Sequence, residues 1–140
     1  MFDLKNDIGV VNALDVQTIS TNTTTAGDII DLQDYEGATF ILQSGTVTDG
    51  SYAVLVEEGD DSGLSDAAAV ADGDLIGTEA NAAFVAADDN EVRTLGYRGE
   101  KRYIRVSLVS TGTTSGGVFG ATCIKSHPHV KPDVTNKDAA

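Results

Sequence analysis

Short segments of alternating apolar and polar residues run through this sequence, and clusters of Gly, Asp, Asn and Ser separate them. In residues 102–109, Ile104, Val106 and Leu108 alternate with mostly polar neighbours, which predicts a β-strand with one buried face. The same reasoning predicts further strands at residues 39–43, 52–57, 91–97 and 118–125. No segment sustains the periodicity of an amphipathic helix, and this excludes a helical bundle.

The connections between these strands carry their own expectations. Asp49–Gly50 is a turn signal between two predicted strands, so residues 39–57 are expected to form a β-hairpin. Ser65–Asp66 is a candidate cap for one helical turn that ends at Val70. The Ala-rich segment Ala80–Ala87 fits either a helical turn or an edge strand. The core candidates in the strand at residues 91–97 are Val92, Leu95 and Tyr97.

Abundant Val, Ile and Thr, 15 glycines and closely spaced turn signals predict an all-β protein. The expected architecture is an antiparallel β-sandwich, jelly-roll-like, with extended N- and C-terminal arms. We expect an N-terminal arm at residues 1–15, a β-sandwich domain at residues 16–126 and a C-terminal arm or tail at residues 127–140. Pro128 and Pro132 favour such a tail, because proline interrupts regular strand pairing.

The chain is strongly acidic, with a formal net charge of -13 over 140 residues. Nucleic-acid backbones and anionic membranes attract Lys and Arg, so both kinds of partner are disfavoured. Residues 1–90 carry a net charge of -17, and residues 91–140 carry +4. This asymmetry fits either complementary poles that meet neighbouring subunits or a solvated acidic region beside a basic strand.

Targeting signals and cysteines add little to this picture. The first residues, MFDLKNDIGVVNALD, lack the basic start and apolar run of a secretory signal. No apolar segment is long enough to span a bilayer. Cys123 is the single cysteine, which excludes an internal disulfide and a cysteine-rich zinc site. The sequence therefore predicts a soluble protein made in a cytoplasm.

Aspartate clusters are the main candidates for a metal site, at residues 60–61, 72–74 and 88–90. They lack the spacing and the late glutamate of a helical calcium loop, which favours solvated turns over a metal site. His127 and His129 flank Pro128 without another His or Cys nearby in the sequence, and an extended segment is the favoured interpretation.

Nothing in the sequence nominates a catalytic residue. A nucleophile elbow, a phosphate-binding loop and a dinucleotide fingerprint are all missing from the sequence, and Cys123 has no evident catalytic partner. We therefore expect a protein that is not an enzyme and has no cofactor and no metal.

One basic cluster stands out, with Tyr97 and Tyr103 interleaved among its members Arg98, Lys101, Arg102 and Arg105. Such a composition can bind single-stranded nucleic acid, but the net charge of -13 opposes that use. Arg and Tyr are enriched in protein–protein interfaces, so the candidate interaction residues are Arg98, Lys101, Arg102, Arg105 and Tyr103. Ordinary strand residues with solvated charges remain an equal alternative.

Four stretches of the chain carry a family resemblance: DLQDYEG at Asp31–Gly37, GTVTDGSYAVLVEEGDD at Gly45–Asp61, LGYRGEKRYIRV at Leu95–Val106 and SHPHVKP at Ser126–Pro132. In this order they resemble a group of small structural proteins of tailed-phage and prophage particles. The resemblance covers residues 28–132, and the best match within the group is to capsid decoration, or cement, proteins.

The resemblance implies a virion protein on the capsid surface, assembled in the host cytoplasm. Its expected partners are the major capsid protein and further copies of itself, with a homotrimer favoured. Decoration of this kind braces neighbouring capsid subunits through many modest contacts. The alternatives are a head–tail joining or tail component, or a calcium- or carbohydrate-binding surface β module. We expect the two arms to carry inter-subunit contacts, and the basic cluster to pair with acidic surface on a neighbour.

Overall fold

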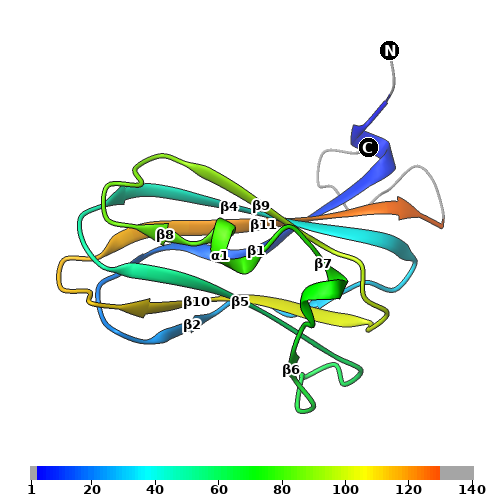
Figure 1. The fold of residues 1–140 in the computed structure, drawn as a ribbon. Helices are drawn as coiled ribbons and strands as arrows, with labels where there is room; N and C mark the ends of the chain where they lie inside the picture. Colours follow the sequence, from blue (N-terminus) through cyan, green and yellow to red (C-terminus); the bar gives the residue numbers. More distant parts are fainter. Residues whose placement is uncertain (1–2, 130–140) are drawn as a thin grey trace.

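The computed structural model describes residues 3–129, which form two β-sheets packed face to face (Figure 1). In chain order the elements are the 3-10 helix η1 (Lys5–Asp7), β1 (Ile8–Ile19), β2 (Thr24–Ala26), β3 (Ile30–Asp31), β4 (Tyr35–Val47), β5 (Ser51–Gly59), β6 (Ala68–Ala69), the 3-10 helix η2 (Asp72–Asp74), β7 (Leu75–Ile76), α1 (Glu79–Ala82), β8 (Phe84–Val85), β9 (Val92–Tyr97), β10 (Tyr103–Thr111) and β11 (Gly117–Pro128). No helix in this part of the chain is long and apolar enough to cross a membrane.

Sheet A has five strands in the order β1-β11-β4-β9-β7. Sheet B has six strands, in the order β2-β10-β5-β6, with β3 also pairing with β10 and β8 with β5. All of these strand pairs are antiparallel. The expected antiparallel β-sandwich is therefore confirmed.

The core lies between the two sheets and follows the alternation of the sequence. Ile104, Val106 and Leu108 on β10 are at most 1% exposed, so the buried face predicted for this strand is confirmed. Leu95 is also buried, but Val92 is 53% exposed and its assignment to the core is wrong. Val92 and Leu95 are three positions apart in the sequence, and side chains an odd number of positions apart point to opposite faces of a strand.

The hairpin expected at residues 39–57 does not form. β4 belongs to sheet A and β5 to sheet B, so the turn between them carries the chain from one sheet to the other. Phe40 on β4 and Tyr52 on β5 are fully buried and face the same core from opposite sides. A turn signal predicts a reversal of the chain, but it does not specify whether the two strands pair or pack.

Two expectations for the middle of the chain resolve differently. The helical turn expected up to Val70 is wrong, because Ala68–Ala69 forms strand β6 beside Glu57 and Glu58. The Asp66 carboxylate instead accepts hydrogen bonds from the backbone N–H groups of Asp60 and Asp61. Ala80–Ala87 contains both expected structures, since α1 is followed by the short strand β8.

The expectation of an N-terminal arm through Asp15 is wrong from residue 8 onward. β1 starts at Ile8 and pairs with β11 along its length, and it buries Ala13 and Leu14 in the core. At the other end, β11 continues to Pro128, so the first residues of the expected C-terminal arm belong to sheet A. The rest of that arm, from residue 130, lies outside the described residues.

Gly27 joins the two sheets along one side of the sandwich. Its N–H donates to the carbonyl of Val106 in sheet B at 2.9 Å, and the N–H of Asp28 donates to the carbonyl of Ala13 in sheet A at 2.8 Å. A Cβ atom at Gly27 would lie 2.1 Å from the oxygen of Ala13 and 2.5 Å from that of Val106. Only glycine fits here, because the neighbours are backbone atoms in paired strands.

Gly27→Ala is therefore expected to lower the free energy of unfolding by about 3 kcal/mol or more, since the sheets must separate locally. Gly73→Ala is the matched control, because no atom lies within 4 Å of the position that its Cβ would take. The control should change stability by no more than about 0.5 kcal/mol. Urea unfolding followed by circular dichroism measures both, and equal effects would contradict this role of Gly27.

Asp49 lies at the end of the sandwich where the β4–β5 turn and the loop between β10 and β11 meet. Both of these connections carry the chain from one sheet to the other. The Asp49 carboxylate accepts hydrogen bonds from the Thr114 side chain and from the backbone N–H groups of Thr114, Ser115 and Gly116. These bonds, led by the one from the Thr114 side chain, hold the pKa of Asp49 far below its usual range. The ionised carboxylate thus fixes the loop between β10 and β11 against the β4–β5 turn.

This low pKa gives a prediction for the pH dependence of stability. In the folded state Asp49 stays ionised below the unfolded-state pKa of about 3.9, so its contribution is complete above that pH and is lost as the pH falls further. The wild-type protein should lose more stability between about pH 5 and pH 3 than Asp49→Asn does. Thermal unfolding at a series of pH values measures the difference, and identical slopes would refute the role of the charge.

Candidate interaction site

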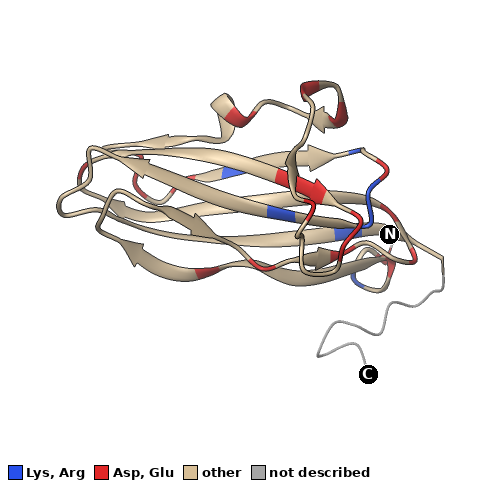
Figure 2. Ribbon diagram, turned by 90° about the horizontal axis from the view of Figure 1, so that it is seen from below, with Lys and Arg blue, Asp and Glu red and all other residues tan. Residues whose placement is uncertain are grey.

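The residues predicted as an interaction site lie at one end of the sandwich. Arg98, Lys101 and Arg102 are in the connection between β9 and β10, while Tyr103 and Arg105 are on β10. We call this end, where the loops at 32–34, 60–67 and 98–102 meet the start of β1 and the end of β11, the charged end. Figure 2 shows most Lys and Arg segments gathered toward it, with Asp and Glu segments among them.

Arg102 forms the most extensive ion pair of the charged end. Its Nε and a terminal nitrogen each donate to the Asp31 carboxylate at 2.9 Å, and a terminal nitrogen also donates to Gln33 Oε1 at 2.7 Å. The guanidinium lies 5.0 Å from the centre of the Tyr103 ring. Arg102 lowers the pKa of Asp31 mainly through these hydrogen bonds, and the pair therefore holds β3 against the start of β10.

The other candidate cations also have partners within the chain. Lys101 Nζ lies 2.7 Å from Asp60 Oδ2, and Arg105 donates to Glu57 Oε1 at 3.0 Å. Arg98 Nε donates to the carbonyl of Gly73 at 2.9 Å. Lys101, Arg102 and Arg105 thus lie beside acids of residues 1–90, and within residues 3–129 the basic cluster does not form a separate basic pole.

Hydrogen bonds of the buried Tyr97 side chain connect the two sheets at this end. The Tyr97 hydroxyl, from sheet A, donates to Glu58 Oε2 in sheet B at 2.6 Å and accepts from the N–H of Lys101 at 3.1 Å. Tyr97 is only 3% exposed. Burial and the hydrogen bond to Glu58 raise the pKa of Tyr97 well above the usual range. The phenol therefore stays protonated and continues to donate its hydrogen bond to Glu58.

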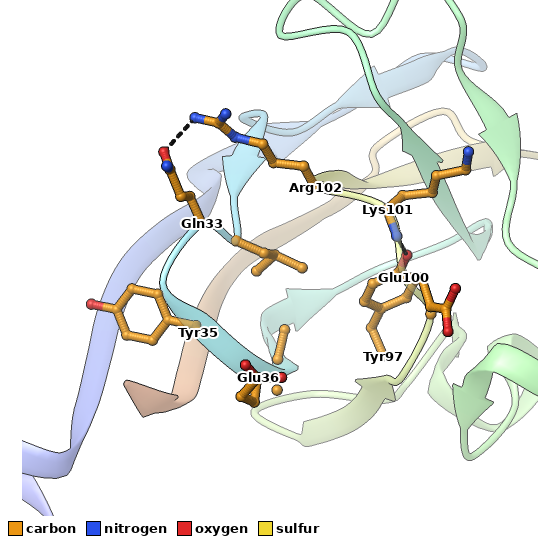
Figure 3. A pocket seen from close by; sticks show the side chains of 11 residues that line it. Gln33, Tyr35, Glu36, Tyr97, Glu100, Lys101 and Arg102 are labelled. Carbon is orange, nitrogen blue, oxygen red and sulfur yellow. Dashed lines mark hydrogen bonds between the residues drawn. The ribbon is translucent and has the colours of Figure 1, made fainter. Parts of the chain in front are cut away.

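A hollow of about 340 Å³ opens between these groups. Figure 3 shows Arg102 and Gln33 meeting at one rim, with Tyr35 and Glu36 on β4 and Glu100 on the loop after β9. The lining residues are Leu32, Gln33, Tyr35, Glu36, Gly37, Ala38, Tyr97, Gly99, Glu100, Lys101 and Arg102. The two acidic and two basic side chains of this lining balance in charge. The hollow therefore offers both hydrogen-bond donors and acceptors and does not act as a basic pocket.

The structure places His129 beside two acids. Its ring contacts the Glu36 carboxylate through Nε2, and Nδ1 lies 3.8 Å from Asp34 Oδ1. His127 instead contacts Ser126. The sequence gives no direct signal for the His129–Glu36 contact, which depends on the pairing of β11 with β4.

Members of two aspartate clusters accept backbone hydrogen bonds, within a turn for Asp61 and from strand β4 for Asp89. Asp61 accepts the N–H groups of Gly63 and Ser65, and Asp89 accepts the N–H of Val47 at 2.7 Å. Within residues 3–129, no group of three or more His, Cys, Asp or Glu side chains could hold a metal ion. The role of aspartate in turn geometry agrees with the interpretation as solvated turns.

Cys123 is fully buried in sheet A, between Val11 on β1 and Phe40 on β4 in the strand register. Burial raises the pKa of its thiol to about 12. The thiol is therefore neutral at physiological pH, whereas nucleophilic attack requires the thiolate. Cys123 acts as a small apolar residue of the core.

Parts of the four sequence stretches for which a family resemblance was expected meet at the charged end, whereas the stretch Gly45–Asp61 begins at the end of the sandwich that contains Asp49. Asp31 pairs with Arg102, Asp60 with Lys101, and Ser126 lies opposite Gly37 in the pairing of β11 with β4. Each of these contacts joins two different stretches that are far apart in the sequence. The residues of the fourth stretch beyond His129 lie outside the described part of the chain.

Comparison with models of protein families finds no match for this chain, and comparison with curated proteins finds none either.

Tyr97→Phe tests the link between the sheets at the charged end. The substitution removes one hydroxyl and leaves Glu58 and the Lys101 N–H without their partner, so stability should fall by about 1–3 kcal/mol. The wild-type protein should also lose stability above about pH 10, where the unfolded chain ionises Tyr97 and the folded chain does not. Tyr97→Phe should lack that part of the loss.

Tyr103→Phe is the control, because the half-buried Tyr103 side chain forms no hydrogen bond through its hydroxyl within residues 3–129. Urea unfolding at neutral and alkaline pH measures both variants. A Tyr97→Phe protein as stable as Tyr103→Phe would show that the buried hydroxyl does not hold the sheets together.

Proposed function

We propose that this protein is a non-enzymatic structural protein of a tailed-phage particle, and that it decorates and stabilises the outer surface of the capsid. The observation that carries the proposal is the convergence at the charged end. Stretches that resemble phage structural proteins are dispersed in sequence, yet they contact one another through the Asp31–Arg102 and Asp60–Lys101 pairs. Charged side chains from distant parts of the sequence thus meet on one surface, which suits a contact with a partner protein.

The charged end suits a contact with capsid subunits. Its side chains are already held by hydrogen bonds, so binding would cost little conformational entropy. Its mixture of charges suits a polar protein surface better than a nucleic-acid backbone. Bridging neighbouring capsid subunits through many modest contacts of this kind would stabilise the particle. The proposed partners are thus the major capsid protein and further copies of this chain, with neither nucleic acid nor membrane.

The proposal includes a jelly-roll topology for the sandwich. In an eight-stranded jelly roll, the first strand pairs with the last, the last with the third, and the third with the sixth. Sheet A has this order in β1-β11-β4-β9, when β2 and β3 count as one strand and β7 and β8 as additions. The order β2-β10-β5-β6 in sheet B corresponds to the second, seventh, fourth and fifth strands.

The composition of purified particles tests the decoration role. The protein should be present in a number comparable to that of the capsid subunits, and particles that lack it should break more readily on heating or osmotic shock. Copies sufficient for a single ring would instead identify a head–tail joining protein. Either that result or the absence of the protein from particles would overturn the proposal.

A charge reversal tests the capsid-facing surface. Arg98→Glu combined with Lys101→Glu should weaken binding of the purified protein to particles that lack it by at least about tenfold at low salt. Thr21→Glu is the control, because Thr21 is exposed outside the charged end, in the connection between β1 and β2. Unchanged binding by the double variant, measured by co-sedimentation, would exclude the charged end as the contact.

A further inference from the structure

The outer face of sheet A has successive rows of cross-strand neighbours that contain no charged residue. The strand register gives three such rows: Val10, Ile124, Thr39, Gly96 and Ile76; then Asn12, Thr122, Ile41 and Thr94; then Gly120, Gln43 and Val92. Val118 and Gly45 continue the face beyond the third row, and Val16 lies beside Gly120. We call these residues the neutral face.

Several aliphatic side chains of the neutral face are strongly exposed. Val16 beside Gly120 is 79% exposed, Ile76 is 59% exposed and Val92 is 53% exposed. Single exposed aliphatic residues are common on protein surfaces, but a contiguous uncharged area of this kind marks an interaction site. The cores of protein interfaces show the same depletion of charge.

The neutral face is not flat. A hollow of about 340 Å³ lies over it, lined in part by Ile41, Val118 and Gly120. Val16 rises beside this hollow and packs its Cγ2 close to Gly120, where a Cβ atom would come within 2.7 Å. A protruding side chain next to a depression is the kind of shape that can be complementary to itself in a second copy.

Charge favours a second copy of this chain as the occupant. Two identical chains of net charge -13 repel each other through every acidic surface, and the neutral face is a surface on which they can meet without opposing carboxylates. At the β1 edge of the face, Asp15 and Asp28 accept hydrogen bonds from the Asn12 amide, so carboxylates border the face without entering its rows.

The size of the face is adequate for self-association. At about 4.8 Å between strands and about 6.8 Å between successive outward-facing residues of a strand, the residues of the neutral face cover roughly 500 Å². Two copies would therefore bury roughly 1,000 Å² in total, about the size at which a specific interface is expected. Two sheets packed face to face are also a common arrangement in β proteins.

We propose that the neutral face of sheet A is an interface between copies of this chain. The inference is independent of the capsid role, since the charged end and not the neutral face carries that proposal. A chain that self-associates through sheet A without binding capsids would leave this inference intact, and a monomeric chain on capsids would overturn it alone.

Light scattering coupled to size-exclusion chromatography of the purified full-length chain tests the proposal. The wild-type protein should elute as an oligomer at about 10 µM, and association should strengthen when salt is raised from about 0.05 M to about 0.5 M, because salt screens the repulsion between acidic chains. Val16→Glu and Thr94→Glu should each weaken association by at least about tenfold, since each places an unpaired carboxylate in the contact. Both positions are exposed, so the variants should fold.

Val85→Glu is the matched control, because Val85 is 50% exposed but lies on β8 of sheet B. It should associate as the wild type does. A monomeric wild-type chain, equal association of all variants, or equal weakening by Val85→Glu would each overturn the proposal. Association that weakens with salt would overturn it too, because that is the behaviour of a contact made by ion pairs.

Discussion

Strand β11 holds sheet A together, because it lies between β1 and β4 and pairs with both over most of its length. β1 therefore has no strand partner in sheet A until β11, about 100 residues further along the chain, is in place. Once β11 is in place, Phe119 packs 4.3 Å from Tyr52 and 5.3 Å from Phe84, measured between ring centres. One strand thus connects the order of sheet A with the aromatic centre of the core.

This arrangement also determines where charges meet. Antiparallel pairing of β10 with β3 and β5 brings Arg102 beside Asp31 and Arg105 beside Glu57. Acids and bases that are far apart in the sequence thereby form ion pairs at one end of the sandwich. The outward-facing rows of sheet A take no part in these pairs and contain no charged residue. The protein consequently presents two different surfaces, one of mixed charge and one neutral.

The alternation of apolar and polar residues correctly predicted features that depend on residues close together in the sequence. These features are the buried face of β10 and the sandwich class. Alternation did not predict the partner of each strand: the turn at Asp49–Gly50 suggested a hairpin, whereas β4 and β5 lie in different sheets. β1 was missed because shifts in its register with β11, between Asn12 and Gln17, break the simple alternation. The sequence identified the basic cluster, but it did not identify the acidic partners, which depend on pairings about 40 to 70 residues apart, as in Lys101–Asp60 and Arg102–Asp31.

The central claim is that this sandwich binds the outside of a capsid through its charged end. Electron cryomicroscopy of particles that contain the protein tests this claim directly. The account predicts density for the sandwich on the outer capsid surface, with the loop at residues 98–102 and Asp31 within contact distance of capsid subunits. Density at the neck of the particle, or a sandwich whose charged end points into solvent, would contradict it.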